Sequence, residues 1–171
     1  RSVLQERTTG QALTDVEIEI SIQNRLINHS GELFRDVSVD VHEARVVLTG
    51  SVPRRADQIA ATREAWAVPG VAEVTDELAI AEDSGTETYL NDVWISNQLR
   101  YHLLTDLDIR SVNFNITTVD GAVHITGLAR SEAELQRVIR HAQSVPGVRH
   151  VVNHALTIDD PRRVEQLAKV G

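Results

Sequence analysis

Cysteine and methionine are both absent from the 171 residues, and aromatic side chains make up only 4% of them. Without cysteine the chain forms no disulfide, has no thiolate nucleophile and offers zinc no cysteine ligand. No run of about 18 apolar residues occurs, so no transmembrane segment is expected. Glycine-rich phosphate loops, nucleophile elbows and HExxH motifs are also missing from the sequence. We therefore expect a binding protein rather than an enzyme, and we expect no cofactor.

The net charge of −8 is unevenly distributed. Residues 16–80 carry 11 acidic and 6 basic side chains, whereas residues 93–158 carry 5 acidic and 6 basic side chains and five of the seven histidines. Between them, residues 81–92 are acidic. A nucleic-acid-binding protein needs a concentrated basic surface, so nucleic acid is not an expected partner. The second half is the part better suited to approach an anionic surface.

The sequence contains the same segment twice. Val16 to Val74 aligns without a gap with Val93 to Val151, an offset of 77 residues. The motif Val-Val-Leu-Thr-Gly at 46–50 aligns with Val-His-Ile-Thr-Gly at 123–127, and Val-Pro-Gly-Val occurs at both 68–71 and 145–148. Repetition at a fixed period indicates a duplicated structural unit. Shared residue types are then explained by the fold, and differences between the copies are candidates for function.

Each copy is predicted to run helix, strand, strand, helix, strand. Capping boxes, in which a Thr or Ser and a Glu three residues later bond each other's backbone amides, predict helix starts at Thr14 and Ser131. Strict alternation of apolar residues predicts strands over 37–41 and 112–116. The third strand of the second copy, within 148–158, is expected to hold one residue more than its counterpart, absorbed by a bulge.

These motifs resemble BON domains, in two tandem copies that cover residues 14–158. The resemblance implies an α+β fold of two αββαβ domains, each with a three-stranded mixed sheet and two helices on one face. The expected divisions are an N-terminal extension 1–13, domain 14–80, acidic linker 81–91, domain 92–158 and a tail 159–171.

The tandem arrangement is similar to the dual-BON-domain lipoproteins of the Gram-negative outer membrane. That similarity implies a periplasmic protein of envelope integrity and stress response, tethered through a lipidated cysteine upstream of Arg1. It also implies contact between the first helix of the second domain and anionic phospholipid, with a tryptophan near the helix start that Trp94 matches. Outer-membrane or periplasmic proteins are the other expected partners.

The residues of this helix agree with a membrane contact. Trp94 and Tyr101 lie off the apolar stripe formed by Ile95, Leu99 and Leu103, so they are expected to face away from the domain core. The first copy has Glu17 and Asn24 in their places, so the fold does not require aromatic residues there. Trp94 is expected to insert among lipids, Tyr101 to support it at the headgroup level and Arg100 to contact lipid phosphate. The remaining candidates are Leu90, Val93, Asn97 and Gln98.

A second apolar pair, Ile59 and Trp66, is predicted to lie off the core on the second helix of the first copy. Two interpretations follow: the aromatic patches face lipid or a protein partner, or they form inter-domain or oligomer contacts, as in an envelope adaptor protein.

His124, His150 and His154 lie on predicted strands without a supporting carboxylate pattern, so no metal site is predicted.

Overall fold

The computed structural model describes residues 13–81 and 85–163, which form two compact units, here called the first and second domains. The first domain contains α1 (Asp15–Ser30), β1 (Val37–His42), β2 (Arg45–Val52), α2 (Arg55–Trp66) and β3 (Glu73–Ile80). The second contains α3 (Thr86–Thr105), the short 3-10 helix η1 (Ser111–Asn113), β4 (Phe114–Val119), β5 (Ala122–Ala129), α4 (Glu132–Ser144), β6 (His150–Asn153) and β7 (Leu156–Thr157). The predicted α+β class and the predicted element order are confirmed.

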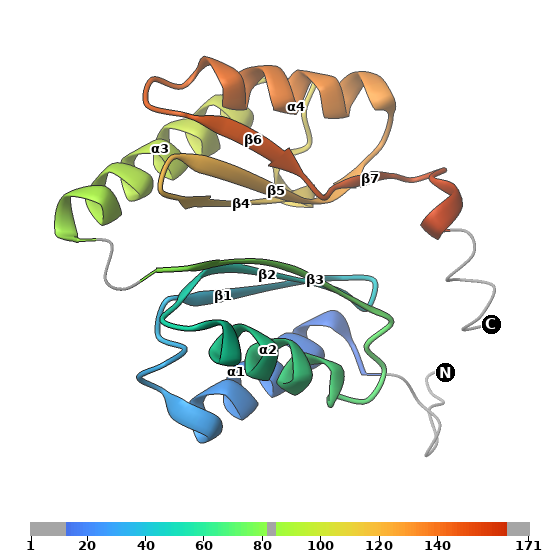
Figure 1. Ribbon diagram of the computed structural model, residues 1–171. Helices are drawn as coiled ribbons and strands as arrows, with labels where there is room; N and C mark the ends of the chain where they lie inside the picture. The colour runs from blue at the N-terminus through green and yellow to red at the C-terminus, as the bar shows by residue number, and fades with distance from the viewer. Residues whose placement is uncertain (1–12, 82–84, 164–171) are drawn as a thin grey trace. The chain divides into compact units, whose positions relative to one another are not determined.

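Each domain has a mixed sheet with its two helices on one face (Figure 1). In the first domain β2 is central, antiparallel to β1 and parallel to β3. In the second domain β5 is central, antiparallel to β4 and parallel to both β6 and β7. The second sheet has four strands because the strand that corresponds to β3 is interrupted and forms β6 and β7.

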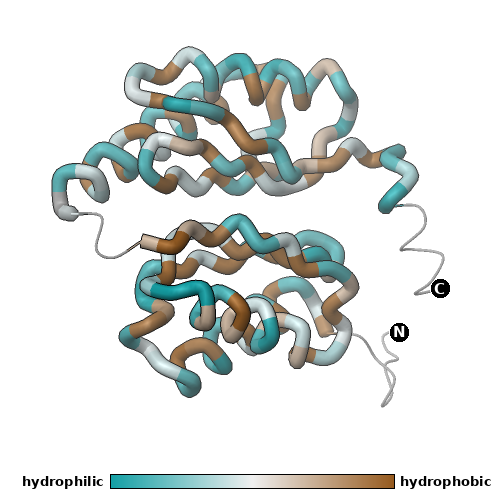
Figure 2. Tube along the Cα trace, viewed as in Figure 1, coloured by the Kyte–Doolittle hydropathy of each residue, from teal (hydrophilic) through white to brown (hydrophobic). Residues whose placement is uncertain are grey.

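The core of each domain lies between its helices and its sheet. The first helix of each domain contributes the predicted stripe, Ile18, Ile22 and Leu26 in α1 and Ile95, Leu99 and Leu103 in α3, all of them buried. The central strands supply the opposite side of the core, and apolar and polar stretches alternate along them (Figure 2). Because a helix buries only one stripe against a sheet, the opposite side of α3 is left outside the core.

The two predicted capping boxes differ in the structure. At α1 the box is complete: the Glu17 amide donates to Thr14 Oγ1 at 3.2 Å and the Thr14 amide donates to Glu17 Oε1 at 2.8 Å. At α4 the Glu134 amide donates to Ser131 Oγ at 3.1 Å, but the reciprocal bond is absent. The Glu134 carboxylate instead accepts the backbone amides of Arg110 and Arg130, each at 2.8 Å, and forms an ion pair with the Arg130 guanidinium at 2.6 Å.

The strand predicted from Val112 begins two residues later. Val112 lies in η1 and is 82% exposed, and β4 starts at Phe114. The Asn113 amide donates to the Arg110 carbonyl at 3.1 Å, which closes a turn before the strand. The apolar alternation at Val112 is thus accidental, and this part of the prediction is wrong.

The predicted bulge in the last strand is also wrong. The pairing of β5 with β6 and β7 keeps one register, from Ala122 opposite His150 to Leu128 opposite Leu156, so no extra residue is inserted. The strand is interrupted because the Asn153 side chain bonds both the amide and the carbonyl of Ala155, at 3.0 and 3.3 Å. Ala155 belongs to the core at the position that Leu78 occupies in the first domain.

One aspartate in each domain ties the first helix to the hairpin between the first two strands. Both hairpin turns have positive φ at their two central residues, the geometry of a type I′ turn. The Asp92 carboxylate accepts the amides of Asp120 at 2.7 Å and Gly121 at 2.9 Å. At the equivalent place in the first domain, Asp15 accepts the amides of Glu43 at 2.6 Å and Ala44 at 2.9 Å. These carboxylates fix α1 at its first residue and α3 at its seventh residue over their sheets.

A histidine–carboxylate pair joins the two helices of each domain, with the partners exchanged between the domains. In the first domain His29 of α1 lies 2.9 Å from Glu64 of α2. In the second domain Asp106, at the end of α3, lies 2.7 Å from His141 of α4. The hydrogen bond from its histidine is the main reason why the pKa of each carboxyl, Glu64 and Asp106, is lower than usual.

Candidate membrane-contact site

The helix α3 begins at Thr86, inside the stretch that the sequence assigned to a linker, so Leu90 lies on the helix. The residues Leu90, Val93, Trp94, Asn97, Tyr101 and Leu104, here called the α3 outer face, follow helical spacing on the side away from the buried stripe. Among the described helices, none is long and apolar enough to cross a membrane, α3 included.

The α3 outer face is apolar and open to solvent. Trp94 is 45% exposed and Tyr101 is 63% exposed, as their helical positions predict. Leu90 and Val93 are also exposed, at 59% and 38%. Asn97 is exposed between them, whereas Gln98 is half-buried at the margin. The structure therefore places the predicted aromatic and aliphatic candidates on one continuous face, with Gln98 beside it.

Three apolar residues at the far end of this face were missed by the sequence reasoning. Leu104 is 71% exposed on the last turn of α3, and Leu107 and Val112 follow it with 98% and 82% of their surfaces exposed. Leu104 was detectable because it lies three residues beyond Tyr101, on the same side of the helix. Leu107 was not, since it belongs to an irregular segment with no periodicity, and Val112 was assigned to a strand because it alternates with Phe114 and Ile116.

Arg100 lies at the edge of the face and is already engaged. Its Nη2 donates to the carbonyl of Ile116 in β4 at 2.9 Å, and its Nη1 donates to Asn97 Oδ1 at 3.2 Å. The guanidinium has five donor hydrogens, so these bonds leave others for a phosphate oxygen. The contacts hold Arg100 close to the sheet edge, which limits how far it reaches toward a ligand.

The first helix of the first domain also has an exposed apolar side, which the sequence comparison overlooked. Val16, Ile20 and Ile27 of α1 are 67%, 49% and 63% exposed. The two helices differ in character: α1 has Glu17 and Asn24 where α3 has its two aromatic residues. Of these two helices, α3 is therefore the one whose outer face combines aliphatic side chains with the amphipathic rings that suit a membrane interface.

The second predicted patch, Ile59 and Trp66, lies on α2 with 48% and 50% of each residue exposed. Both residues line a groove of about 450 Å³, together with Arg55, Gln58, Thr62, Arg63 and Asp76. The patch is thus open within the first domain and is flanked by two arginines. Its contact with the aromatic residues of the other domain stays a prediction.

Two of the three candidate histidines stack within the second domain. The rings of His124 and His154 are nearly parallel, with centroids 5.6 Å apart, and His124 Nδ1 lies 3.4 Å from His154 Nε2. Burial, and then the proximity of His154 and His150, lowers the pKa of His124 to about 4. His124 is therefore neutral at neutral pH and contributes no positive charge to this domain.

The chain is thus a duplicated α+β module of two tandem αββαβ domains, each with its helices on one face of a mixed sheet. The BON domain family model matches residues 14–82 and 91–159. The chain therefore belongs to the BON-domain family.

Several relatives match most of the chain. An uncharacterized protein encoded in the gshII 5′ region of Anaplasma centrale is 36% identical over 143 residues, which are 83% of this chain and 93% of the relative. The osmotically-inducible protein Y of Escherichia coli is 29% identical over 86% of this chain and 75% of its own length. The outer membrane lipoprotein DolP of Haemophilus influenzae is 26% identical over 85% of this chain and 75% of its own length.

Proposed function

We propose that this protein is a non-enzymatic component of the bacterial envelope that contacts a phospholipid membrane surface through the α3 outer face. The similarity to an osmotically-inducible protein and to an outer membrane lipoprotein supports an envelope role. A periplasmic location and a lipid anchor upstream of the described residues belong to the same proposal.

The observation that carries the proposal is the exposure of Trp94 and Tyr101 on an otherwise aliphatic helix face. An exposed apolar patch of this kind marks an interaction surface. With 45% of Trp94 exposed, its insertion removes on the order of 100 Å² from water, worth roughly 2.5 kcal/mol at about 25 cal/mol/Å². A contact of this strength is peripheral and reversible, so an anchor elsewhere would hold the protein at the membrane.

Charge favours an orientation with the second domain toward anionic lipid. Residues 93–158 have one more basic than acidic side chain, whereas residues 16–80 have five more acidic than basic side chains. An anionic surface repels the first domain and attracts Arg100, worth about 1 kcal/mol for one arginine near the surface. The first domain would then act as a spacer or as a docking module for other envelope proteins.

A second candidate function is protein binding through the α2 patch. Arg55 and Arg63 flank Ile59 and Trp66 along one groove, an arrangement that suits an acidic and apolar segment of a partner. In this adaptor function Trp66 carries the binding energy, and Trp94 lies in an inter-domain or partner interface.

The two functions are distinguished by flotation with vesicles containing phosphatidylglycerol. We expect Trp94→Ala to reduce flotation strongly with an unchanged melting temperature. The matched control is Trp66→Ala, which removes an equally exposed tryptophan from α2 and is expected to float like the unchanged protein. Flotation that survives Trp94→Ala, or a variant that only loses stability, would contradict the membrane contact and favour the adaptor function.

A further inference from the structure

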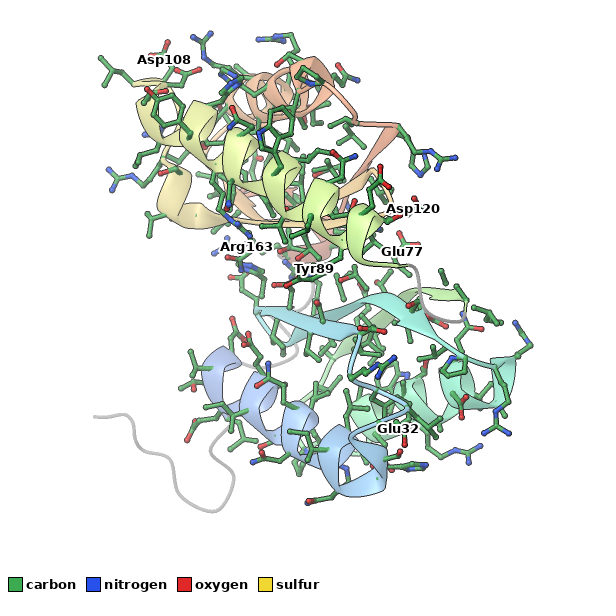
Figure 3. The ribbon with its side chains drawn as sticks, turned by 90° about the vertical axis from the view of Figure 1, so that its left-hand side faces the viewer. Glu32, Glu77, Tyr89, Asp108, Asp120 and Arg163 are labelled. Carbon is green, nitrogen blue, oxygen red and sulfur yellow. The ribbon has the colours of Figure 1, made fainter. Side chains whose placement is uncertain are left out.

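A cleft of about 580 Å³ opens beside the first turns of α3 in the second domain. Trp94 and Leu90 form one side of it, so the cleft adjoins the α3 outer face. The hairpin turn of β4 and β5 forms the other side, and Figure 3 shows Asp120 at this turn beside the start of α3. The remaining lining residues are Glu87, Thr88, Asn91, Asp92, Gly121, Gly147 and Arg149.

Glycine at position 121 allows Arg149 to lie across the cleft. A Cβ added at Gly121 would lie 2.7 Å from both Cγ and Cδ of Arg149. The Arg149 amide donates to the Gly121 carbonyl at 2.8 Å, which anchors the backbone beneath this side chain. The Arg149 side chain is 66% exposed, and its Nη1 lies 3.5 Å from Asp120 Oδ2 at the cleft. At this long distance from its carboxylate, the guanidinium retains donors for a ligand.

The charges of the cleft are mixed, with more negative than positive groups. Glu87, Asp92 and Asp120 face a single cation, Arg149. Asp92 is engaged by the two backbone amides of the turn, whereas Glu87 is exposed and the Asp120 side chain is 68% exposed. A purely anionic ligand would meet three carboxylates here. A ligand that carries a cation beside an anion matches both signs, and the Trp94 ring adds a surface that attracts cations.

The first domain shows that the fold does not require these residues. At the equivalent positions it has Ala72 in place of Arg149, Glu17 in place of Trp94 and Ala44 in place of Gly121. Its hairpin is nevertheless held by the same aspartate clamp. The arginine, the indole and the glycine that makes room for the arginine are therefore additions of the second domain, and together they line one cleft.

We propose that this cleft binds the phosphoethanolamine headgroup of a membrane phospholipid, with Arg149 on the phosphate and with Asp120 and Glu87 on the primary ammonium. The inference rests on the proposed membrane contact, because the acyl chains of the lipid would continue along Leu90 and Trp94. A primary ammonium donates hydrogen bonds to carboxylates, which a quaternary choline ammonium cannot do. The cleft therefore favours ethanolamine over choline.

The test uses the full chain with Trp66→Phe, so that Trp94 is the only tryptophan, and follows its fluorescence blue shift. Vesicles contain a constant fraction of phosphatidylglycerol, and the remainder is either phosphatidylcholine or a mixture of phosphatidylcholine and phosphatidylethanolamine. We expect roughly fivefold tighter binding with phosphatidylethanolamine, the effect of one well-placed exposed ion pair. Arg149→Gln and Asp120→Asn should remove this difference, and asparagine tolerates the positive φ of the turn.

The matched control is Arg140→Gln, which removes an exposed arginine of α4 outside the cleft and should keep the fivefold difference. Because phosphatidylethanolamine also changes lipid packing, soluble glycerophosphoethanolamine is added as a competitor, with glycerophosphocholine beside it. Competition by the first compound alone supports the headgroup site.

Equal binding to both vesicle types, or a preference that persists in Arg149→Gln, would overturn the headgroup site. The membrane contact is tested separately by vesicle flotation, which needs no tryptophan: it stands if Trp94→Ala strongly reduces flotation, and flotation that survives Trp94→Ala would overturn it.

Discussion

The aspartate that clamps each hairpin gives the sharpest stability prediction. Asp92→Ala leaves the amides of Asp120 and Gly121 without the carboxylate that accepts both, at 2.7 and 2.9 Å. A hydrogen bond to a charged group contributes about 1.5–3 kcal/mol. Water reaches the exposed hairpin tip and replaces part of this, so we expect a loss of about 2–3 kcal/mol in the unfolding free energy of the second domain.

The two tryptophans allow the domains to be followed separately, since Trp66 lies in the first and Trp94 in the second. Urea unfolding of the second domain is monitored through Trp94 in a chain that carries Trp66→Phe. Adding Asp92→Ala to this chain should lower the urea midpoint by roughly 2 M, if the unfolding free energy changes by about 1 kcal/mol per M urea. Asp92→Asn keeps one acceptor oxygen and should lose about half as much free energy.

The matched control is Asp15→Ala, which removes the equivalent clamp from the first domain. In a Trp94→Phe chain, where Trp66 reports on the first domain, Asp15→Ala should lower the urea midpoint. In the Trp66→Phe chain, where Trp94 reports on the second domain, it should leave the midpoint unchanged. The reasoning would be refuted if Asp92→Ala changed the unfolding free energy by less than about 0.5 kcal/mol, the usual range of neutral surface changes.

Two further predictions concern the second domain. Gly127 has a φ of +134°, and a Cβ there would collide with the Asn113 carbonyl oxygen, so Gly127→Ala should cost about 3 kcal/mol or more in urea unfolding. The pKa of Asp106 is lowered from 3.8 by its bonds to His141 and Arg137, so its contribution to stability is present above about pH 4 and is lost as the pH falls further. The melting temperature should therefore fall less steeply between pH 6 and pH 3 in Asp106→Asn than in the unchanged protein. An equally steep fall would show that other groups govern the acid transition.

The repeat made the fold predictable, because two copies in register specify which residues the architecture needs. Both apolar helix stripes, the hairpins and the complete capping box at Thr14 follow from local spacing alone. The failures are places where polar side-chain bonds, rather than the apolar pattern, decide the local structure. Contacts with Arg110 and Arg130 engage the Glu134 carboxylate, and the Asn153 side chain interrupts the last strand. The spacing of apolar residues contains no information about these bonds.

The candidate site was predicted less completely. Trp94 and Tyr101 were placed correctly on the outside of the helix because a period of 3.6 residues determines the direction of a side chain. Arg149, in contrast, lies more than fifty residues further along the chain and reaches the cleft because β6 follows β5 in parallel. A pairing of this range appears only once the sheet register is known.

The exchanged histidine–carboxylate pairs also affect how a duplicated chain avoids assembling its halves incorrectly. Tandem domains of similar sequence risk swapping equivalent elements during folding. If α3 packed on the first domain in place of α1, Asp106 would face Glu64; if α1 packed on the second domain, His29 would face His141. Each wrong pairing brings together two groups of the same kind, two acids or two imidazoles, whereas each correct pairing joins an acid to an imidazole. The reversal thus gives each correct helix pair a complementarity between acid and imidazole that a swapped pair would lack.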